Sequence, residues 1–230
     1  MKLVFCFPGQ SFSKNWMAAW NETIRWLYKN DITYITINAY SPVIYNCRNM
    51  LLGAQGNPPN SFKPFNGTIE YDWIIWVDND SIWKSSDIVQ LISKPEHKIV
   101  TGFYIQHDNK TYAQAIFYNE NKTDLVWLPK EYVNANTNRI KLAATGMGFM
   151  AVKVGVFETL GCPFFKPIEY QIDTTTTAFL SEDTGFCHRA INAGYDVWGD
   201  TKIQVKHEKP LMLSGDGQYG TMPENLILNR

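Results

Sequence analysis

One stretch constrains the fold of this chain more than any other: Trp73–Asp80, which reads WIIWVDND. Its first five residues are apolar and either β-branched or aromatic, which predicts a strand buried on both faces. Asp78 and Asp80 follow at the tip of that strand, where ionised carboxylates are costly unless a cation lies beside them. Divalent cations prefer oxygen ligands, and ligands of open α/β sheets bind at the carboxyl ends of the strands. The stretch therefore predicts a metal-assisted site at these two aspartates.

The composition limits the classes of protein to which the chain can belong. With 230 residues, of which 45% are hydrophobic, it can bury a sizeable core, and we expect a single domain. The formal net charge of −1 gives no support for a nucleic-acid or anionic-membrane partner, since such partners favour a basic surface. The apolar run Leu3–Phe7 stops at Pro8 and is too short for a signal peptide or transmembrane segment, so we expect a cytoplasmic protein. The four cysteines form no Cys-x-x-Cys pair and are expected to be reduced thiols.

The N-terminal part of the chain alternates strand and helix patterns. Lys2–Phe7 is typical of a buried strand, and Ile32–Ile37 is expected to be a second strand. Ser13 is a favourable N-cap for a helix after the first strand, and a second helix is expected over about Val43–Leu52, with Pro42 in its first turn. This β-α-β-α order predicts a parallel sheet with helices on its faces.

The rest of the chain is expected to complete the same sheet. We expect, in chain order, a loop (Gly53–Asn66), a helix capped by Ser85 or Ser86, a strand (Ile99–Tyr104), strand pieces (Tyr112–Tyr118 and Leu125–Leu128), a mobile loop (Cys162–Thr177), a helix (Glu182–Ala193) and two short strands (Tyr195–Trp198 and Ile203–Val205). Gly146 and Gly148 interrupt an apolar run, which in a strand marks a bulge or a close backbone approach. The predicted fold class is α/β: one domain with a mixed, mainly parallel central sheet flanked by helices, a nucleotide-type half over about residues 1–104 and a less regular half over about residues 105–210.

Three polar groups carry the chemistry, and each has an ordinary structural explanation when taken alone. The Asp78–Asp80 triplet consists of residue types that turns favour at a strand exit. Glu182 and Asp183 open a helix after Ser181, where the helix dipole stabilises acids, but a fixed helix also suits a general base. His207 follows a strand pattern, and it is either a plain surface or core histidine or the nitrogen ligand that completes an oxygen-rich manganese site.

The order of these three groups resembles that of the nucleotide-sugar glycosyltransferases with the GT-A fold, especially the family-2-like enzymes of the Asp-x-Asp type. The resemblance extends from Lys2 to about Pro210 and includes Arg48 in the second predicted helix and a Gly-interrupted strand at Thr145–Met150. It implies a single GT-A catalytic domain with a Rossmann-like nucleotide half. It also implies a hexosyltransferase that moves a sugar from a nucleoside diphosphate sugar, expected to be a UDP-sugar, to an acceptor hydroxyl on a glycan, lipid or protein.

The resemblance also assigns roles to individual residues. Asp80 would bind a divalent cation, Mn²⁺ or Mg²⁺, that bridges the diphosphate, and His207 would complete this metal site. Asp78 would contact the ribose, or the metal through water. Asp183 corresponds to the catalytic base of inverting members, with Glu182 as a supporting or acceptor-binding acid.

Further donor contacts follow from the same resemblance. Asn79 belongs to the donor-binding motif, Arg48 is placed for the nucleotide or diphosphate, and the loop after the first strand is placed for the base through Pro8, Gln10 and Ser11. Four aromatic side chains either stack on sugar or base or simply fill the core: Trp127, Trp198, Tyr104 and Tyr112. The Gly-rich tail, residues 211–230, either orders over the donor as a lid or frays as an ordinary terminus.

Other classes of protein compete with this interpretation. A haloacid-dehalogenase-type phosphohydrolase also places Asp-x-Asp after an apolar strand and would use Asp78 and Asp80. That family continues with Thr or Val where this chain has Ile82, and it needs a second acidic motif that Gly185–His188 does not supply. A sugar-nucleotide pyrophosphorylase needs a Gly-rich, Arg-containing loop after the first strand, which Phe7–Ser11 does not provide. A catalytically inactive sugar-binding protein would keep the same fold.

Overall fold

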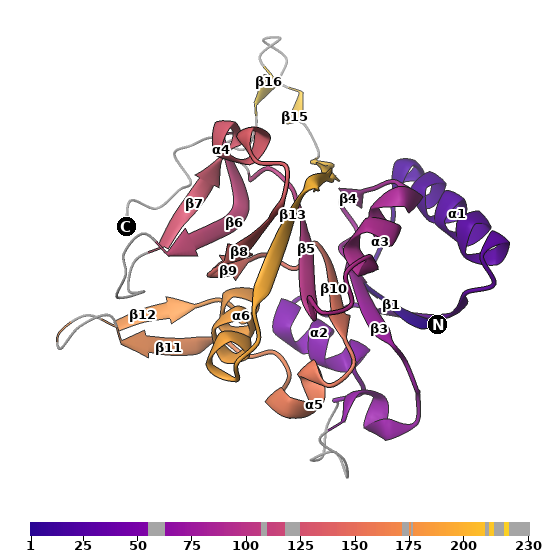
Figure 1. The fold of residues 1–230 in the computed structure, drawn as a ribbon, viewed down its shortest axis with the longest axis horizontal. Coiled ribbons are helices and arrows are strands. Elements are labelled where there is room, and N and C mark those ends of the chain that lie inside the picture. Colours follow the sequence, from indigo (N-terminus) through magenta and orange to yellow (C-terminus); the bar gives the residue numbers. More distant parts are fainter. Residues whose placement is uncertain are drawn as a thin grey trace.

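The computed structural model of the chain describes residues 1–54, 63–106, 110–117, 125–171, 175, 177–209, 212–213 and 219–220. A seven-stranded central sheet runs through the molecule in the order β2-β1-β3-β10-β5-β13-β8 (Figure 1). Its strands are β1 (Lys2–Pro8), β2 (Thr33–Ala39), β3 (Trp73–Val77), β5 (Ile99–Phe103), β8 (Arg139–Leu142), β10 (Phe149–Lys153) and β13 (Val197–Gln204). Five strands run in one direction, and β10 and β8 run in the other. The prediction of a mixed sheet is confirmed, and three of its six strand pairings are parallel.

Helices cover both faces of this sheet (Figure 1). Two of them contribute to the hydrophobic cluster on one face: α1 (Lys14–Lys29) and α3 (Ser85–Ile92). Three contribute to the cluster on the other face: α2 (Ile44–Leu51), α5 (Val156–Leu160) and α6 (Glu182–Asn192). Strand β3 lies between these two clusters, and all five of its residues are buried, as its unbroken apolar run predicts.

Local sequence explains why the first helix forms where it does. The hydroxyl of Ser13 accepts a hydrogen bond from the backbone N–H of Trp16 at 3.1 Å, so the predicted N-cap is confirmed. Trp16, Trp20 and Leu27 recur at helical spacing and are buried against the sheet. This packing fixes the N-terminal end of α1 beside the carboxyl end of β3, where the indole N–H of Trp16 donates to the carbonyl of Asp78 at 3.1 Å.

Smaller sheets and short helices surround the central sheet. Strand β6 (Thr111–Phe117) pairs with β7 (Leu125–Pro129) and β9 (Ala144–Thr145), while β4 (Ser81–Ile82) pairs with β14 (Lys206–His207). Two further hairpins consist of β11 (Ile168–Gln171) with β12 (Thr177–Leu180), and β15 (Met212–Leu213) with β16 (Tyr219–Gly220). A 3-10 helix, η1, spans Pro64–Gly67, and α4 spans Lys130–Ala135.

Two details of the predicted helix starts are wrong, the N-cap of α3 and the position of Pro42. The N-cap of α3 is Lys84 and not Ser85 or Ser86, because the carboxylate of Asp87 accepts the backbone N–H of Lys84 at 2.8 Å and fixes that residue as the boundary. Helix α2 begins at Ile44 after Val43, so Pro42 lies outside its first turn.

Three predicted segments also differ from the structure. The two short strands expected at Tyr195–Trp198 and Ile203–Val205 form one strand, β13, with an irregularity after Gly199. The loop expected over Cys162–Thr177 contains β11, with residues 172–174 and 176 outside the described part. The loop expected over Gly53–Asn66 ends in η1, with residues 55–62 outside the described part.

Other predictions concern the cysteines, the membrane and the tail. All four cysteines are free, as expected. Within the described residues, the chain has no helix with both the length and the apolar character needed to span a membrane. The tail predicted as a lid or frayed end lies outside the described residues, apart from the backbone of β15 and β16.

Candidate active site

The candidate site lies at the carboxyl end of β3, where Asp78–Asp80 meets the loop that follows β1. The side-chain amide of Asn79 donates to the carbonyl of Ser11 at 3.0 Å. A side chain at Gly9 would place its Cβ 2.6 Å from that of Asn79, so only glycine allows this approach. Pro8, the last residue of β1, is buried, whereas Gln10 and Ser11 in the loop that follows are exposed. The structure thus brings together the acidic motif and the loop predicted to hold the base.

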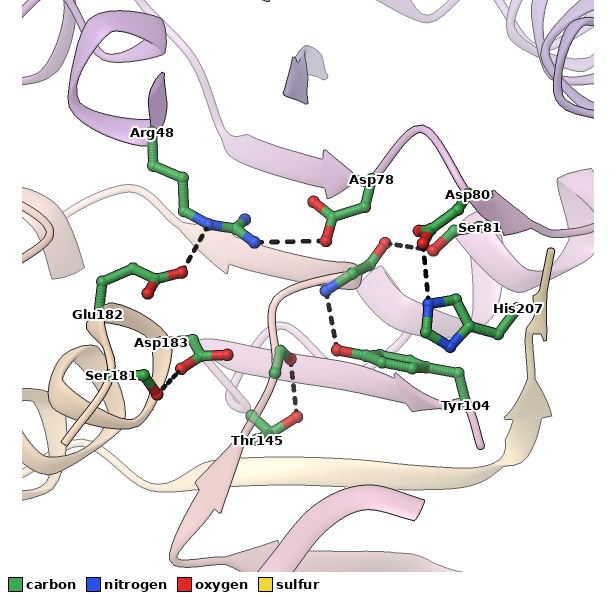
Figure 2. Close-up of polar contacts among 12 residues, drawn as sticks. Arg48, Asp78, Asp80, Ser81, Tyr104, Thr145, Ser181, Glu182, Asp183 and His207 are labelled. Atoms are coloured by element: carbon green, nitrogen blue, oxygen red, sulfur yellow. Dashed lines mark hydrogen bonds and ion pairs between the residues drawn. The ribbon is translucent and has the colours of Figure 1, made fainter. Parts of the chain in front are cut away.

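Asp80 and His207, which are 127 positions apart, face each other across this site (Figure 2). His207 Nε2 lies 3.0 Å from Asp80 Oδ2. Its Nδ1 lies 2.9 Å from the carbonyl of Ile105, and since a carbonyl only accepts, Nδ1 is the donor and Nε2 is turned toward Asp80. The pairing of β14 with β4 sets this approach, because His207 stands opposite Ser81 in the register.

A lysine that sequence reasoning missed binds the same carboxylate. The ammonium of Lys209 lies 2.6 Å from Asp80 Oδ2. Burial alone would raise the pKa of Asp80, but the hydrogen bonds from His207 and Lys209 outweigh it and lower the pKa to about 2. Asp80 is therefore ionised at neutral pH.

Arg48 joins the acidic motif to the start of α6, as Figure 2 shows. Its Nη2 lies 3.3 Å from Asp78 Oδ2, and its Nε lies 3.4 Å from Glu182 Oε1, close enough for an ion pair. The guanidinium is buried; burial would lower the pKa of Arg48, but Asp78 and Glu182 outweigh it and raise the pKa. In turn, burial raises the pKa of the Asp78 carboxyl against the opposing effect of Arg48. The arginine thus places one buried positive charge between a partly buried acid, Asp78, and a buried acid, Glu182.

The two acids at the N-terminus of α6, Glu182 and Asp183, have different surroundings. Burial and the neighbouring Asp183 raise the pKa of Glu182, against the opposing effect of Arg48. Asp183 Oδ1 accepts the hydroxyl of Ser181 and, at 2.7 Å, the backbone N–H of Thr184. Ser181 is the N-cap residue by position, but its hydroxyl caps no backbone amide and holds Asp183 instead. As a result Asp183 Oδ2 points the other way, on the side of Gly146.

Tyr104 stands between these two groups of residues, although the sequence offers it only as one of several aromatics. Its hydroxyl accepts the backbone N–H of Gly148 at 3.1 Å, and its ring meets the His207 ring edge to face at 5.4 Å between centroids. A Cβ at Gly146 would lie 2.1 Å from this hydroxyl and 3.5 Å from Asp183 Oδ2, and a Cβ at Gly148 would also meet Tyr104. The close backbone approach predicted at these two glycines is therefore confirmed. Burial, then the Asp78 charge, raises the pKa of Tyr104, so the phenol stays protonated.

Glu208 fixes the segment that carries His207 and Lys209, and sequence reasoning missed it as well. Its carboxylate accepts the Ser13 hydroxyl at 2.5 Å and the Asn15 side-chain amide at 2.8 Å. Its backbone N–H donates to the carbonyl of Asp80 at 2.7 Å. The only sequence signal for this role is the charged run that follows the apolar alternation ending at Val205.

The donor set fits a divalent cation that is shared with a ligand. Among the described residues no three His, Cys, Asp or Glu side chains converge into a complete metal site. Asp80 and His207 supply one oxygen and one nitrogen, and magnesium and manganese often take only one or two protein ligands, with phosphate oxygens and water as the rest. Asp78 lies next to this pair but its Oδ2 faces Arg48, and its Oδ1 is buried without a hydrogen-bond partner among the described residues.

Fold and site together define a mixed α/β protein with acids at the carboxyl ends of parallel strands. No protein-family model and no curated protein sequence matches the chain. Its fold is similar to that of A197 from STIV, with a TM-score of 0.55 over 95% of this chain and 93% of that one; at 18% identity this shows the fold alone.

Two glycosyltransferases are among the solved structures with weaker similarity. GalNAc-T7, solved with UDP, GalNAc and Mn²⁺, has a TM-score of 0.49 at 12% identity, over 91% of this chain but only 43% of that one. A Drosophila beta-1,4-galactosyltransferase 7 mutant, solved with manganese, UDP-Gal and xylobiose, has a TM-score of 0.45 at 11% identity, over 91% and 71% of the two chains.

Proposed function

We propose that this protein is a metal-dependent glycosyltransferase, which moves a sugar from a nucleoside diphosphate sugar, in the first instance a UDP-sugar, to an acceptor hydroxyl. One observation carries the proposal. Three polar groups that are far apart in the sequence meet at one end of the sheet: the Asp78–Asp80 motif, the first turn of α6 and His207. When a glycosyl group leaves a diphosphate, negative charge develops on the diphosphate. Charged groups fixed in advance at that place stabilise the developing charge.

Asp183 is the residue best placed to act as general base. The hydroxyl of Ser181 and the amide of Thr184 hold its Oδ1, which leaves Oδ2 on the side of Gly146 and the Tyr104 hydroxyl. An acceptor hydroxyl within hydrogen-bond distance of Oδ2 would pass its proton to it while attacking the sugar. Arg48 keeps this helix end docked against the acidic motif through its ion pairs with Glu182 and Asp78.

Asp80 and His207 would hold Mn²⁺ or Mg²⁺, which as a Lewis acid would stabilise the negative charge of the departing diphosphate. The protein's own part is to fix these two ligands. Ile105 orients the imidazole, His207 lies in β14, and Asp80 directly precedes β4, the strand with which β14 pairs. The loop of Pro8, Gln10 and Ser11 lies beside the motif, where it would contact the base of the donor.

The test is a panel of nucleoside diphosphate sugars incubated with and without Mn²⁺, with the released nucleotide measured. We expect release from at least one of these donors, lost with a chelator and in Asp80→Ala but retained in the matched variant Asp196→Ala, whose carboxylate lies on the exposed surface paired with Lys141. Release of phosphate from simple phosphoesters alone would instead identify a phosphohydrolase that uses Asp78 and Asp80. Donor binding without release would identify an inactive sugar-binding protein.

A further inference from the structure

Two nitrogen atoms, one from a histidine and one from a lysine, converge on a single carboxylate oxygen at the centre of the site. Asp80 Oδ2 lies 3.0 Å from His207 Nε2 and 2.6 Å from the Lys209 ammonium. The shorter of these two contacts is made by the lysine, which is a compact point charge on a flexible stem. The protein itself thus provides a cation for the very oxygen that a divalent metal would need.

The surroundings of Lys209 allow its head to leave while its backbone stays in place. Its side chain is about one-third exposed, at 34%, so movement of the stem into water disturbs no core packing. The preceding Glu208 is anchored to Ser13, to Asn15 and to the carbonyl of Asp80. The Lys209 ammonium can therefore move while the backbone beside it stays in place.

We propose that Lys209 is an internal cation that occupies Asp80 in the metal-free protein and must be displaced before a divalent metal binds. An ammonium within hydrogen-bond distance of Oδ2 and a metal coordinated by Oδ2 exclude each other, because both need the same lone pairs and both carry positive charge. Once displaced, the ammonium remains beside the metal and pairs with an anionic group of the donor, such as a diphosphate oxygen. The lysine thus opposes binding of the metal alone and favours binding of the metal together with the diphosphate.

This inference rests on the proposed function for the identity of the anion, but its first test needs only the metal. Binding of Mn²⁺ to the whole chain is measured by titration calorimetry without nucleotide, for the wild type and Lys209→Met. Removing a competitor worth up to about 1 kcal/mol predicts roughly fivefold tighter Mn²⁺ binding in the variant. Asp80→Asn must abolish this binding in both backgrounds, which locates the metal.

Lys206→Met is the matched control. Lys206 lies in β14, three residues before Lys209; it is exposed and carries the same charge, and within the described residues its side chain makes no contact with Asp80. Equal tightening in both variants would mean that general charge and not displacement governs the affinity, and it would overturn the inference.

The second measurement is the affinity for UDP with Mn²⁺ at saturation. We expect the opposite sign here: Lys209→Met should bind UDP several-fold more weakly than wild type and Lys206→Met. Simple structural damage would weaken both Mn²⁺ and UDP binding, so it cannot produce this pair of results.

Each outcome separates the two proposals. If the wild type binds Mn²⁺ and Lys209→Met binds it equally or more weakly, the inference that Lys209 competes with the metal is wrong. The proposed function is then unaffected. Mn²⁺ binding in Lys209→Met but not in wild type supports the inference in its strongest form. Absence of Mn²⁺ binding in both overturns the inference together with the metal dependence of the proposed function. If Mn²⁺ bound more tightly to Lys209→Met but UDP bound to neither protein, the displacement of Lys209 by the metal would stand. The proposed UDP-sugar donor would then be wrong.

Discussion

The two carboxylate oxygens of Asp183 have different surroundings, and this difference gives a prediction at the scale of a single residue. Asp183→Asn keeps the shape of the side chain and an oxygen for the Thr184 amide, but it removes the proton acceptor. Because a general base contributes on the order of 100-fold or more to a rate, we expect the transfer rate to fall by about that factor while the donor dissociation constant stays unchanged. Initial rates and titration calorimetry with the donor measure the two quantities.

A matched control is Glu131→Gln, which neutralises an acid in the first turn of another helix, α4. It should change neither quantity, because Glu131 is exposed and lies away from the acidic motif. Undiminished turnover in Asp183→Asn would remove this residue as the base and would point to a mechanism that retains the configuration of the sugar.

At the scale of elements, Glu208, which directly follows β14, joins the strand pair β4–β14 to the start of α1 through side-chain hydrogen bonds. Glu208→Ala removes the acceptor of Ser13 and Asn15, so we expect the free energy of unfolding to fall by about 1 kcal/mol. We also expect Mn²⁺ binding to weaken several-fold, since His207 loses its fixed position. Chemical denaturation and titration calorimetry measure these changes.

Rescue distinguishes positioning from a general loss of stability. Glu208→Gln keeps one acceptor oxygen and should recover part of the Mn²⁺ affinity, whereas Glu22→Ala, on the exposed side of α1, should leave the affinity as in wild type. If Glu208→Ala lost stability but bound Mn²⁺ normally, Glu208 would have no role in positioning the site.

The sequence predicts those elements whose pattern is local. Continuous apolar residues predict β3, and helical spacing with a serine N-cap predicts α1. Helices α4 and α5 are only six and five residues long, too short for a periodic pattern to appear. Strand β13 is divided in the prediction because Asp200 interrupts its apolar run; the structure allows this buried acid by pairing it with Arg139.

The candidate site was predictable only in part, because only some of its residues belong to a local sequence pattern. The acidic motif, the start of α6 and His207 stand at element ends that the sequence marks, so their convergence was expected. The contacts of Arg48 with Glu182, of Lys209 with Asp80 and of Tyr104 with Gly148 join distant segments. They depend on side-chain directions and register that no short pattern contains.

At the scale of the whole molecule, a buried ion pair holds the edge of the sheet that lies away from the acidic motif. Arg139 Nε lies 2.9 Å from Asp200 Oδ2, with side chains 3% and 2% exposed, and its Nη2 also donates to the carbonyls of Gln90 and Leu91 near the end of α3. Arg139→Met leaves the carboxylate of Asp200 buried without its cation. We expect the free energy of unfolding to fall by about 3–5 kcal/mol, measured by denaturant titration.

The same edge offers an internal control. Lys141 and Asp196 also lie 2.9 Å apart, but their side chains are 64% and 53% exposed. Lys141→Met should therefore change the free energy of unfolding by no more than about 1 kcal/mol. Equal losses in the two variants would show that burial does not set the strength of these pairs.

The place of β5 in the sheet has a consequence for how the chain acquires its structure. Both neighbours of β5 in the sheet, β10 and β13, follow it in the sequence by many residues. During synthesis from the N-terminus, the parallel trio of β2, β1 and β3 can assemble early, while β5 waits unpaired until β10 and then β13 emerge. Such non-local pairing carries a large loop-closure entropy, so completion of the sheet should be a late and slow event. Because Tyr104 directly follows β5 and His207 lies beyond β13, the candidate site assembles only in that last step.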